Sequence, residues 1–430
     1  MAEGSRRDMV AGSAVTTKRG PHDMLWYVLA VALIASRRPD GLVNPQFWAE
    51  DGTVWFAQAY NQGPLSALLT PWTGYVQSFS RLVAAASLLV PFRHAPLVFN
   101  VAAVLAQALA PFFLASSRFA SILPDRRVRL LAALLWIGAP NGFEIQSNVT
   151  NVQTHLALLS LLVVVSDVAP TRAWATFDVL ALLLGGLSGP TCVLLVPVAA
   201  LAWWWDRRPR RLVLLATLLV PAAVQATVYL VTGGAGRETS ALGATPLRLV
   251  EILGGQIFLA GIVGAKGYAG LLHHGGVPFR IAVPVAGICG LALTARALWV
   301  SRSAPLRLLC LFAALALAAA LTGPALDAVP RWEGMKLPYV GGRYYAPPIL
   351  AWLAVLLWTA CADPLIRVKL LARVALAAAL LIGVPLDWVV PARPDLEFAR
   401  HAARFEHRRP GKMIGIPIPP AGWKMRLHKH

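Results

Sequence analysis

Long apolar runs with few internal charges follow one another along most of the chain, from residue 24 to residue 388. A membrane-spanning helix needs about 20 apolar residues, and flanking aromatic and Arg side chains extend the shorter runs toward that length. The pattern predicts an all-α polytopic membrane protein with about 11 transmembrane helices. The predicted spans lie near 24–36, 95–115, 128–140, 153–167, 174–188, 190–205, 212–232, 281–299, 306–322, 346–361 and 368–388.

Two stretches need a separate interpretation. Counting residues 79–92 as a span would invert every later loop, so we expect an amphipathic helix that lies on the membrane surface. Residues 185–190 combine Gly, Ser and Pro, which end helices, and they predict a break between two consecutive helices.

Composition strengthens the membrane assignment. Hydrophobic residues make up 57% of the 430 residues and charged residues 14%, against about 25% in soluble proteins. This composition excludes a soluble enzyme. The formal net charge of +19 comes largely from Arg clusters between apolar runs, such as residues 206–211. Such placement indicates membrane topology and contact with lipid headgroups, and it gives no support to nucleic-acid binding.

The charges also predict an orientation in an inner (plasma) membrane. Short Arg-rich loops fall on one side, which the positive-inside rule makes cytoplasmic together with the tail 1–23. The transmembrane domain then covers 24–388, with its first outer loop at 37–94 and a final outer segment at 389–430. That last segment is basic as well, which the rule does not favour. The remaining outer loops are 141–152, 233–280 and 323–345.

Cysteine and histidine usage predicts neither disulfides nor a structural metal. The four cysteines lie in or beside apolar runs without close spacing. His273 and His274 are adjacent but lack a third ligand nearby in sequence, which makes a poor zinc site. We expect no metal and no cofactor, although a divalent ion stays open.

The first outer loop carries the most informative polar residues. Glu50 and Asp51 follow Trp48 shortly after the first span. A carboxylate held at such a place can take a proton from a reacting hydroxyl. Glu50 could equally cap a helix that begins near Thr53.

The second outer loop is unusually polar, with Asn148, Asn151, Gln153 and His155 close together. Amide side chains both donate and accept hydrogen bonds, which suits sugar hydroxyls. The alternative is ordinary turn formation and helix capping. Together with the aromatic residues Trp48 and Tyr75 of the first loop, these are the candidates for binding sugar or acceptor.

Taken together, these features resemble the GT-C superfamily, membrane glycosyltransferases that use polyprenyl-phosphate-linked sugars. The architecture of one span, a large outer loop with an acidic pair, an interfacial helix and many further spans is similar to theirs. Four short segments also resemble uncharacterised bacterial members: residues 47–52, 148–151, 342–345 and 418–425.

The resemblance implies an inverting sugar transfer on the outer, periplasmic face. An acid in the first outer loop would deprotonate the acceptor hydroxyl; the matching residue is Asp51, with Glu50 as second choice or partner. Cations would then stabilise the departing lipid phosphate. Candidates are Arg343 first, followed by Arg237, Lys266 and Arg331; contact with lipid headgroups is the alternative for each.

The expected partners are therefore a polyprenyl-phosphate-linked sugar donor, a cell-envelope glycan or lipid acceptor, and membrane lipids. Two other functions remain open. A transporter or flippase of lipid-linked glycans would show repeats, broken helices and intramembrane charges, whereas a polymerase would rely on Arg and His in large outer loops.

Overall fold

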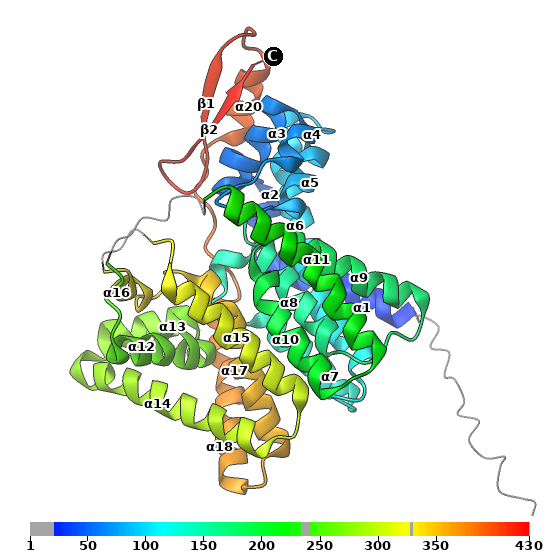
Figure 1. Ribbon diagram of the computed structural model, residues 1–430. Coiled ribbons are helices and arrows are strands. Elements are labelled where there is room, and N and C mark those ends of the chain that lie inside the picture. Colours follow the sequence, from blue (N-terminus) through cyan, green and yellow to red (C-terminus); the bar gives the residue numbers. More distant parts are fainter. Residues whose placement is uncertain (1–20, 234–240, 327–329, 430) are drawn as a thin grey trace, which may run out of the picture.

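The computed structural model describes residues 21–233, 241–326 and 330–429, and these are mostly helical. Two groups of helices stand side by side, and a smaller third body, which we call the head, projects from one end of them (Figure 1).

The first group holds α1 (Pro21–Arg37), α6 (Ala95–Ala115), α7 (Arg126–Gly138), α8 (Val152–Val165), α9 (Arg172–Leu187), α10 (Thr191–Trp205) and α11 (Pro209–Val231). The second group holds α12 (Pro246–Ile252), η5 (Leu253–Leu259), α13 (Ala260–His274), α14 (Gly276–Val300), α15 (Ala304–Thr322), α16 (Arg331–Met335), α17 (Gly342–Ala362), α18 (Ile366–Ala378), η6 (Ala379–Gly383) and α19 (Val384–Asp387). The head holds α2 (Asp40–Val43), η1 (Asp51–Phe56), α3 (Ala57–Gln62), α4 (Pro64–Leu69), α5 (Ser78–Ser87), α20 (Phe398–Glu406), β1 (Met413–Pro417) and β2 (Lys424–His428).

Every apolar run that the sequence marks as a span forms a helix. Within the described residues, seven helices are long and apolar enough to cross a membrane, so the chain is a mostly helical membrane protein. Others are shorter; α7 has 13 residues, or about 20 Å at 1.5 Å per residue. The number of eleven crossing helices therefore stays a prediction.

The segment 233–280, assigned to an outer loop, contains a long helix that the sequence analysis did not predict. Residues 246–274 form α12, η5 and α13 in succession and are one of the seven candidate spans. Glycines interrupt the apolar pattern of this segment in the sequence. Gly254 is required because it packs against the backbone of α14, where an added Cβ would lie 2.0 Å from the Val283 carbonyl oxygen.

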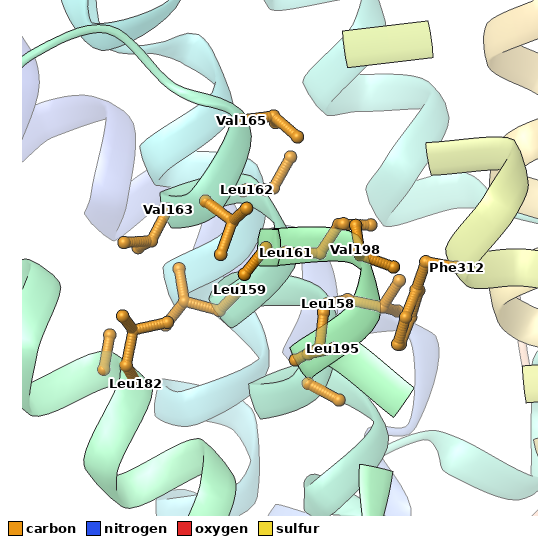
Figure 2. Packing of buried hydrophobic residues seen from close by; sticks show 14 of the residues in the cluster. Leu158, Leu159, Leu161, Leu162, Val163, Val165, Leu182, Leu195, Val198 and Phe312 are labelled. Atoms are coloured by element: carbon orange, nitrogen blue, oxygen red, sulfur yellow. The ribbon is translucent and has the colours of Figure 1, made fainter. Parts of the chain in front are cut away.

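The core of the first group surrounds α8. This helix is apolar on all sides, which is typical of a buried helix, and 12 of its residues are buried. Figure 2 shows Leu158 and Leu161 of α8 among Leu195 and Val198 of α10, with Phe312 of α15 beside them. This packing joins the two groups of helices.

The head joins the first outer loop to the tail, so these two segments lie side by side (Figure 1). Asn61 of α3 donates to the carbonyl of Arg426 in β2 at 3.0 Å and accepts the N–H of His428 at 2.8 Å. Ile418, in the β1–β2 connection, packs on Gly52, where a Cβ would lie 2.7 Å from its Cδ1 atom.

The antiparallel pair β1–β2 corrects the expectation of a wholly α-helical protein. Each strand has only five residues, and a Pro-rich connection separates them. Alternation over so few residues is too weak to recognise in the sequence. The strands form because Met425 and Leu427 of β2 bury their side chains in the core of the head.

Two other expectations concern short segments. The break near residues 185–190 is confirmed, because α9 ends at Leu187 and α10 begins at Thr191. In the stretch 79–92 the helix α5 ends at Ser87 after 10 residues, about 15 Å, which is too short to cross a membrane.

Candidate functional site

Hydrogen bonds connect all five segments that the sequence assigns to the outer side. Arg393 of the tail donates to backbone carbonyls of the first and second segments, at 3.1 and 3.0 Å. Gln256 of the third accepts from Asn141 of the second (3.0 Å) and donates to the carbonyl of Leu337 in the fourth (2.6 Å). We call the region where these segments meet the loop junction. The candidate site lies here.

Asp51 is enclosed in the loop junction. Its side chain is fully buried, and its oxygens accept hydrogen bonds from the backbone N–H of Val149 (3.2 Å), the N–H of Thr150 (2.7 Å) and the Thr150 hydroxyl (2.8 Å). Burial raises the pKa of Asp51 to about 7, although these hydrogen bonds and the charge of Arg393 favour the ionised form. Asp51 thus fixes the turn that leads into α8.

Glu50 is in a different environment. Its side chain is part-buried, and it makes no capping hydrogen bond to the helix η1, which begins at the next residue. The capping role that the sequence left open is therefore not what the structure shows for Glu50. Burial raises the pKa of Glu50; the charge of Arg343 opposes this shift and that of Glu144 adds to it.

Arg343 and Glu144 form an ion pair whose charges act on Glu50. Nη1 of Arg343 donates to Oε1 of Glu144, and the backbone N–H of Arg343 donates to Oε2 at 3.0 Å. Nη2 of Arg343 donates to the hydroxyl of Tyr344 at 3.0 Å. The pair is only partly covered, with 31% of the Arg343 side chain and 14% of the Glu144 side chain exposed.

Arg393 joins the tail to the segments around the acidic pair. Its guanidinium donates to the carbonyl of Gln46 and to Oδ1 of Asn100 (3.2 Å), and it lies 5.3 Å from the ring centre of Trp48. Burial lowers the pKa of Arg393 to about 9, with a contribution from the charge of Arg38. Trp48 is thereby held against a cation and stays part-buried; its role in sugar binding remains a prediction.

Backbone strain accompanies this arrangement. Ala49, Asn141 and Ser147 have φ angles of 47°, 55° and 51°, in the left-handed region that non-glycine residues rarely adopt. Such residues cost of order 1–3 kcal/mol each and cluster at functional sites. Ala49 directly precedes Glu50, and its N–H donates to the carbonyl of Pro419 at 2.7 Å.

The polar side chains of the second loop mainly bind backbone carbonyls of their own segment. The amide of Asn148 donates to the carbonyl of Glu144 (2.8 Å) and accepts from the side chain of Asn151 (2.9 Å). Gln153 donates to the carbonyl of Thr150 at 3.4 Å, and His155 is buried with Nε2 3.0 Å from the carbonyl of Ile145. These contacts stabilise turns within the loop, and sugar binding by the same side chains stays a prediction.

The remaining candidates are spread around the loop junction. Lys266 is exposed, and its Nζ donates to the carbonyl of Val389 at 3.2 Å. Arg331 is buried, and its backbone N–H donates to the carbonyl of Ala241. Tyr75 pairs through its backbone with Trp72. Arg237 lies outside the described residues.

A broken helix borders the junction. At Gly264 the helix Pro246–His274 is interrupted (φ 80°, ψ 166°). Asp387 closes the break, because its Oδ2 accepts the N–H of Ala265 at 2.6 Å and that of Asn141 at 2.8 Å, while Oδ1 accepts the N–H of Lys266 at 3.2 Å. The N-terminus of the second half-helix is therefore satisfied by a carboxylate of the same chain.

Sequence reasoning did not nominate Glu144, Arg393 or Asp387 as site residues. Glu144 could have been found as the one acid of the second loop, beside the amides. Arg393 and Asp387 gave no local signal, because each acts on segments more than 240 positions away. Within the described ranges, no group of three His, Cys, Asp or Glu side chains could hold a metal ion.

Comparison with known proteins adds no relative: no protein-family model and no curated protein matches this chain.

Proposed function

We propose that this chain is a membrane-embedded glycosyltransferase of GT-C type, which transfers a sugar with inversion from a polyprenyl phosphate to a cell-envelope glycan or lipid on the outer face. The observation that supports it best is Glu50: a part-buried carboxylate with a raised pKa beside the partly exposed Arg343–Glu144 pair, at the end of an apolar helical bundle. A raised pKa suits a base that acts at physiological pH. Because the pKa of Asp51 is raised as well, access of the acceptor decides between the two acids.

The structure favours Glu50 over Asp51 as the base. An acceptor hydroxyl can approach a part-buried carboxylate, whereas the Asp51 oxygens are enclosed and already accept three hydrogen bonds. In this account Glu50 takes the acceptor proton, and the acceptor oxygen forms a bond to the anomeric carbon. The bond between that carbon and the phosphate oxygen breaks, and the lipid phosphate leaves with the electron pair.

The departing phosphate needs nearby cations, because negative charge develops on it in the transition state. Arg343 is the first candidate, since its fork of N–H donors suits phosphate oxygens and its side chain is partly exposed. Lys266 is the second, as an exposed ammonium at the edge of the loop junction. Asp51 and Arg393 position the segment that carries Glu50.

The broken helix at Gly264 makes a flippase the second candidate, because transporters bind anionic substrates at the N-termini of half-helices. Here Asp387 occupies that N-terminus, so it is not open to an anionic lipid. This contact favours the enzyme.

Purified protein in proteoliposomes distinguishes the two functions. We expect radiolabelled sugar to move from a polyprenyl-phosphate donor to an added glycan acceptor, and Arg343→Gln to lower this transfer more than Arg343→Lys. Donor movement between leaflets without any sugar transfer would instead establish the flippase.

A further inference from the structure

The tail carries a concentrated positive surface that the proposed chemistry does not use. Residues 394–429 contain eight Lys and Arg against three acidic residues. Seven of these cations are exposed, and Arg400 is paired with Glu397. We call the other six the head cations: Arg404, Arg408, Arg409, Lys412, Lys424 and Arg426. They lie on the side that the positive-inside rule would leave poor in cations.

The fold turns these cations outward. Helix α20 buries Phe398, Ala402 and Phe405 on one face, which leaves Arg404 on the other. Side chains of β2 alternate between the two faces. Met425 and Leu427 point into the head, whereas Lys424 and Arg426 face solvent. Gly415 pairs with Arg426 across the hairpin and leaves space beside it.

Few carboxylates neutralise this surface. Within the tail, Arg400 forms an ion pair with Glu397 at 2.6 Å. Among the residues that the structure describes, none of the head cations has a carboxylate oxygen within 4 Å. At the other end of the bundle some cations are neutralised within the protein; Arg118, for example, is paired with Asp178 at 2.8 Å. The head cations thus remain available to an external anion.

The surroundings favour a soluble anion over a membrane surface. Apolar residues that could enter a bilayer are concentrated on α4 and just after α5, where Leu65, Leu69 and Leu89 are 78%, 85% and 87% exposed. The head cations instead adjoin few exposed large apolar side chains, chiefly Met413 and Trp423. Figure 1 places α20 and the hairpin at the end of the molecule farthest from the two helix groups.

We propose that α20 and the β1–β2 hairpin bind an anionic glycan, and that this glycan is the acceptor of the sugar transfer. Its role as acceptor rests on the function proposed above. Trp423, 39% exposed beside Lys424, offers an aromatic face for a sugar ring. The same hairpin connection reaches the site, because the carbonyl of Pro419 accepts the N–H of Ala49, next to Glu50. Carboxylate or phosphate groups on the glycan would meet the head cations.

Binding of defined polysaccharides tests this inference. The full chain in nanodiscs of neutral phosphatidylcholine is titrated with polygalacturonate, an anionic polymer, and with dextran, a neutral one, at low salt. We expect binding of polygalacturonate alone, weakened by salt because exposed charges are screened. The triple variant Arg404→Gln/Lys424→Gln/Arg426→Gln should bind about tenfold more weakly, since three exposed attractions are lost.

A matched triple variant controls for net charge. Arg126→Gln/Arg127→Gln/Arg302→Gln removes three exposed cations at the other end of the bundle and should change the affinity less than about twofold. Equal weakening in both triples, or equal binding of dextran, would overturn the inference. So would a head triple that loses binding to phosphatidylglycerol vesicles but keeps its affinity for polygalacturonate, which would identify a membrane contact. The assay needs no sugar transfer, so its result is independent of whether the chain is an enzyme.

Discussion

At the scale of single residues, two neighbouring acids have opposite environments. Asp51 points into the protein and holds the turn before α8, whereas Glu50 is part-buried beside charged side chains. The sequence identified the pair but ranked Asp51 first. Two adjacent residues look alike in a sequence, and only the position of the second loop decides which carboxylate is enclosed.

The structural role of Asp51 predicts a loss of stability on its removal. Asp51→Ala leaves the buried N–H groups of Val149 and Thr150 without an acceptor, which costs about 1–3 kcal/mol. Thermal unfolding in detergent should show a lower midpoint for Asp51→Ala and little change for the matched variant Glu50→Ala. Equal midpoints for Asp51→Ala and wild type would contradict the role assigned to Asp51.

The surroundings of Glu50 predict the pH dependence of transfer. Because the raised pKa of Glu50 must be exceeded before it can accept a proton, activity should rise with pH above the usual glutamate value of about 4.3. Arg343→Gln removes a positive charge and should move this rise in activity to higher pH. Glu144→Gln removes a negative charge and should move the rise to lower pH. The measurement is the pH profile of residual transfer; shifts of the same sign in both variants would exclude Glu50 as the titrating base.

At the scale of elements, the apolar pattern predicts most of the helices but not how some of them are built. Long uniform runs such as that of α8 are recognisable because burial on all sides demands apolar residues throughout. The helix Pro246–His274 was missed because its glycines serve close packing and a break. The hairpin was missed because its strands depend on contacts with a loop far away in the sequence.

The break in that helix predicts opposite effects at two glycines. Gly264 has a φ of 80°, and an added Cβ would lie 2.9 Å from the Asp387 carboxyl group, so Gly264→Ala should destabilise the protein by about 1–3 kcal/mol. Gly270 lies in regular helix with open space around it, so Gly270→Ala should be neutral or stabilising by up to about 1 kcal/mol. Thermal midpoints measure both, and a Gly264→Ala protein as stable as Gly270→Ala would show that the break is not required.

At the scale of the whole molecule, the charge rule grouped segments that the structure brings together. All five predicted outer segments meet in the loop junction, although they are widely separated in the sequence. What the rule could not predict is which side chains make the contacts. Arg393 and Asp387 bind backbone groups of other loops, and such contacts leave no pattern near either residue.

The predicted orientation can be tested by labelling. In a cysteine-free background, Glu397→Cys in the head and Arg127→Cys at the other end each introduce one exposed thiol. An impermeant maleimide added to spheroplasts should label Glu397→Cys and not Arg127→Cys. The reverse pattern would place the loop junction on the cytoplasmic side.

The central claim is that Glu50 accepts the proton in a sugar transfer. The most direct measurement is transfer from a radiolabelled polyprenyl-phosphate-sugar donor by wild type and Glu50→Gln, with Glu397→Gln as a matched carboxylate-to-amide control on the exposed tail. Loss of a general base lowers the rate by about 10²–10⁴-fold, so Glu50→Gln should lose at least about 100-fold with an unchanged unfolding midpoint, while Glu397→Gln stays near wild type. Transfer by Glu50→Gln at the wild-type rate would contradict the account.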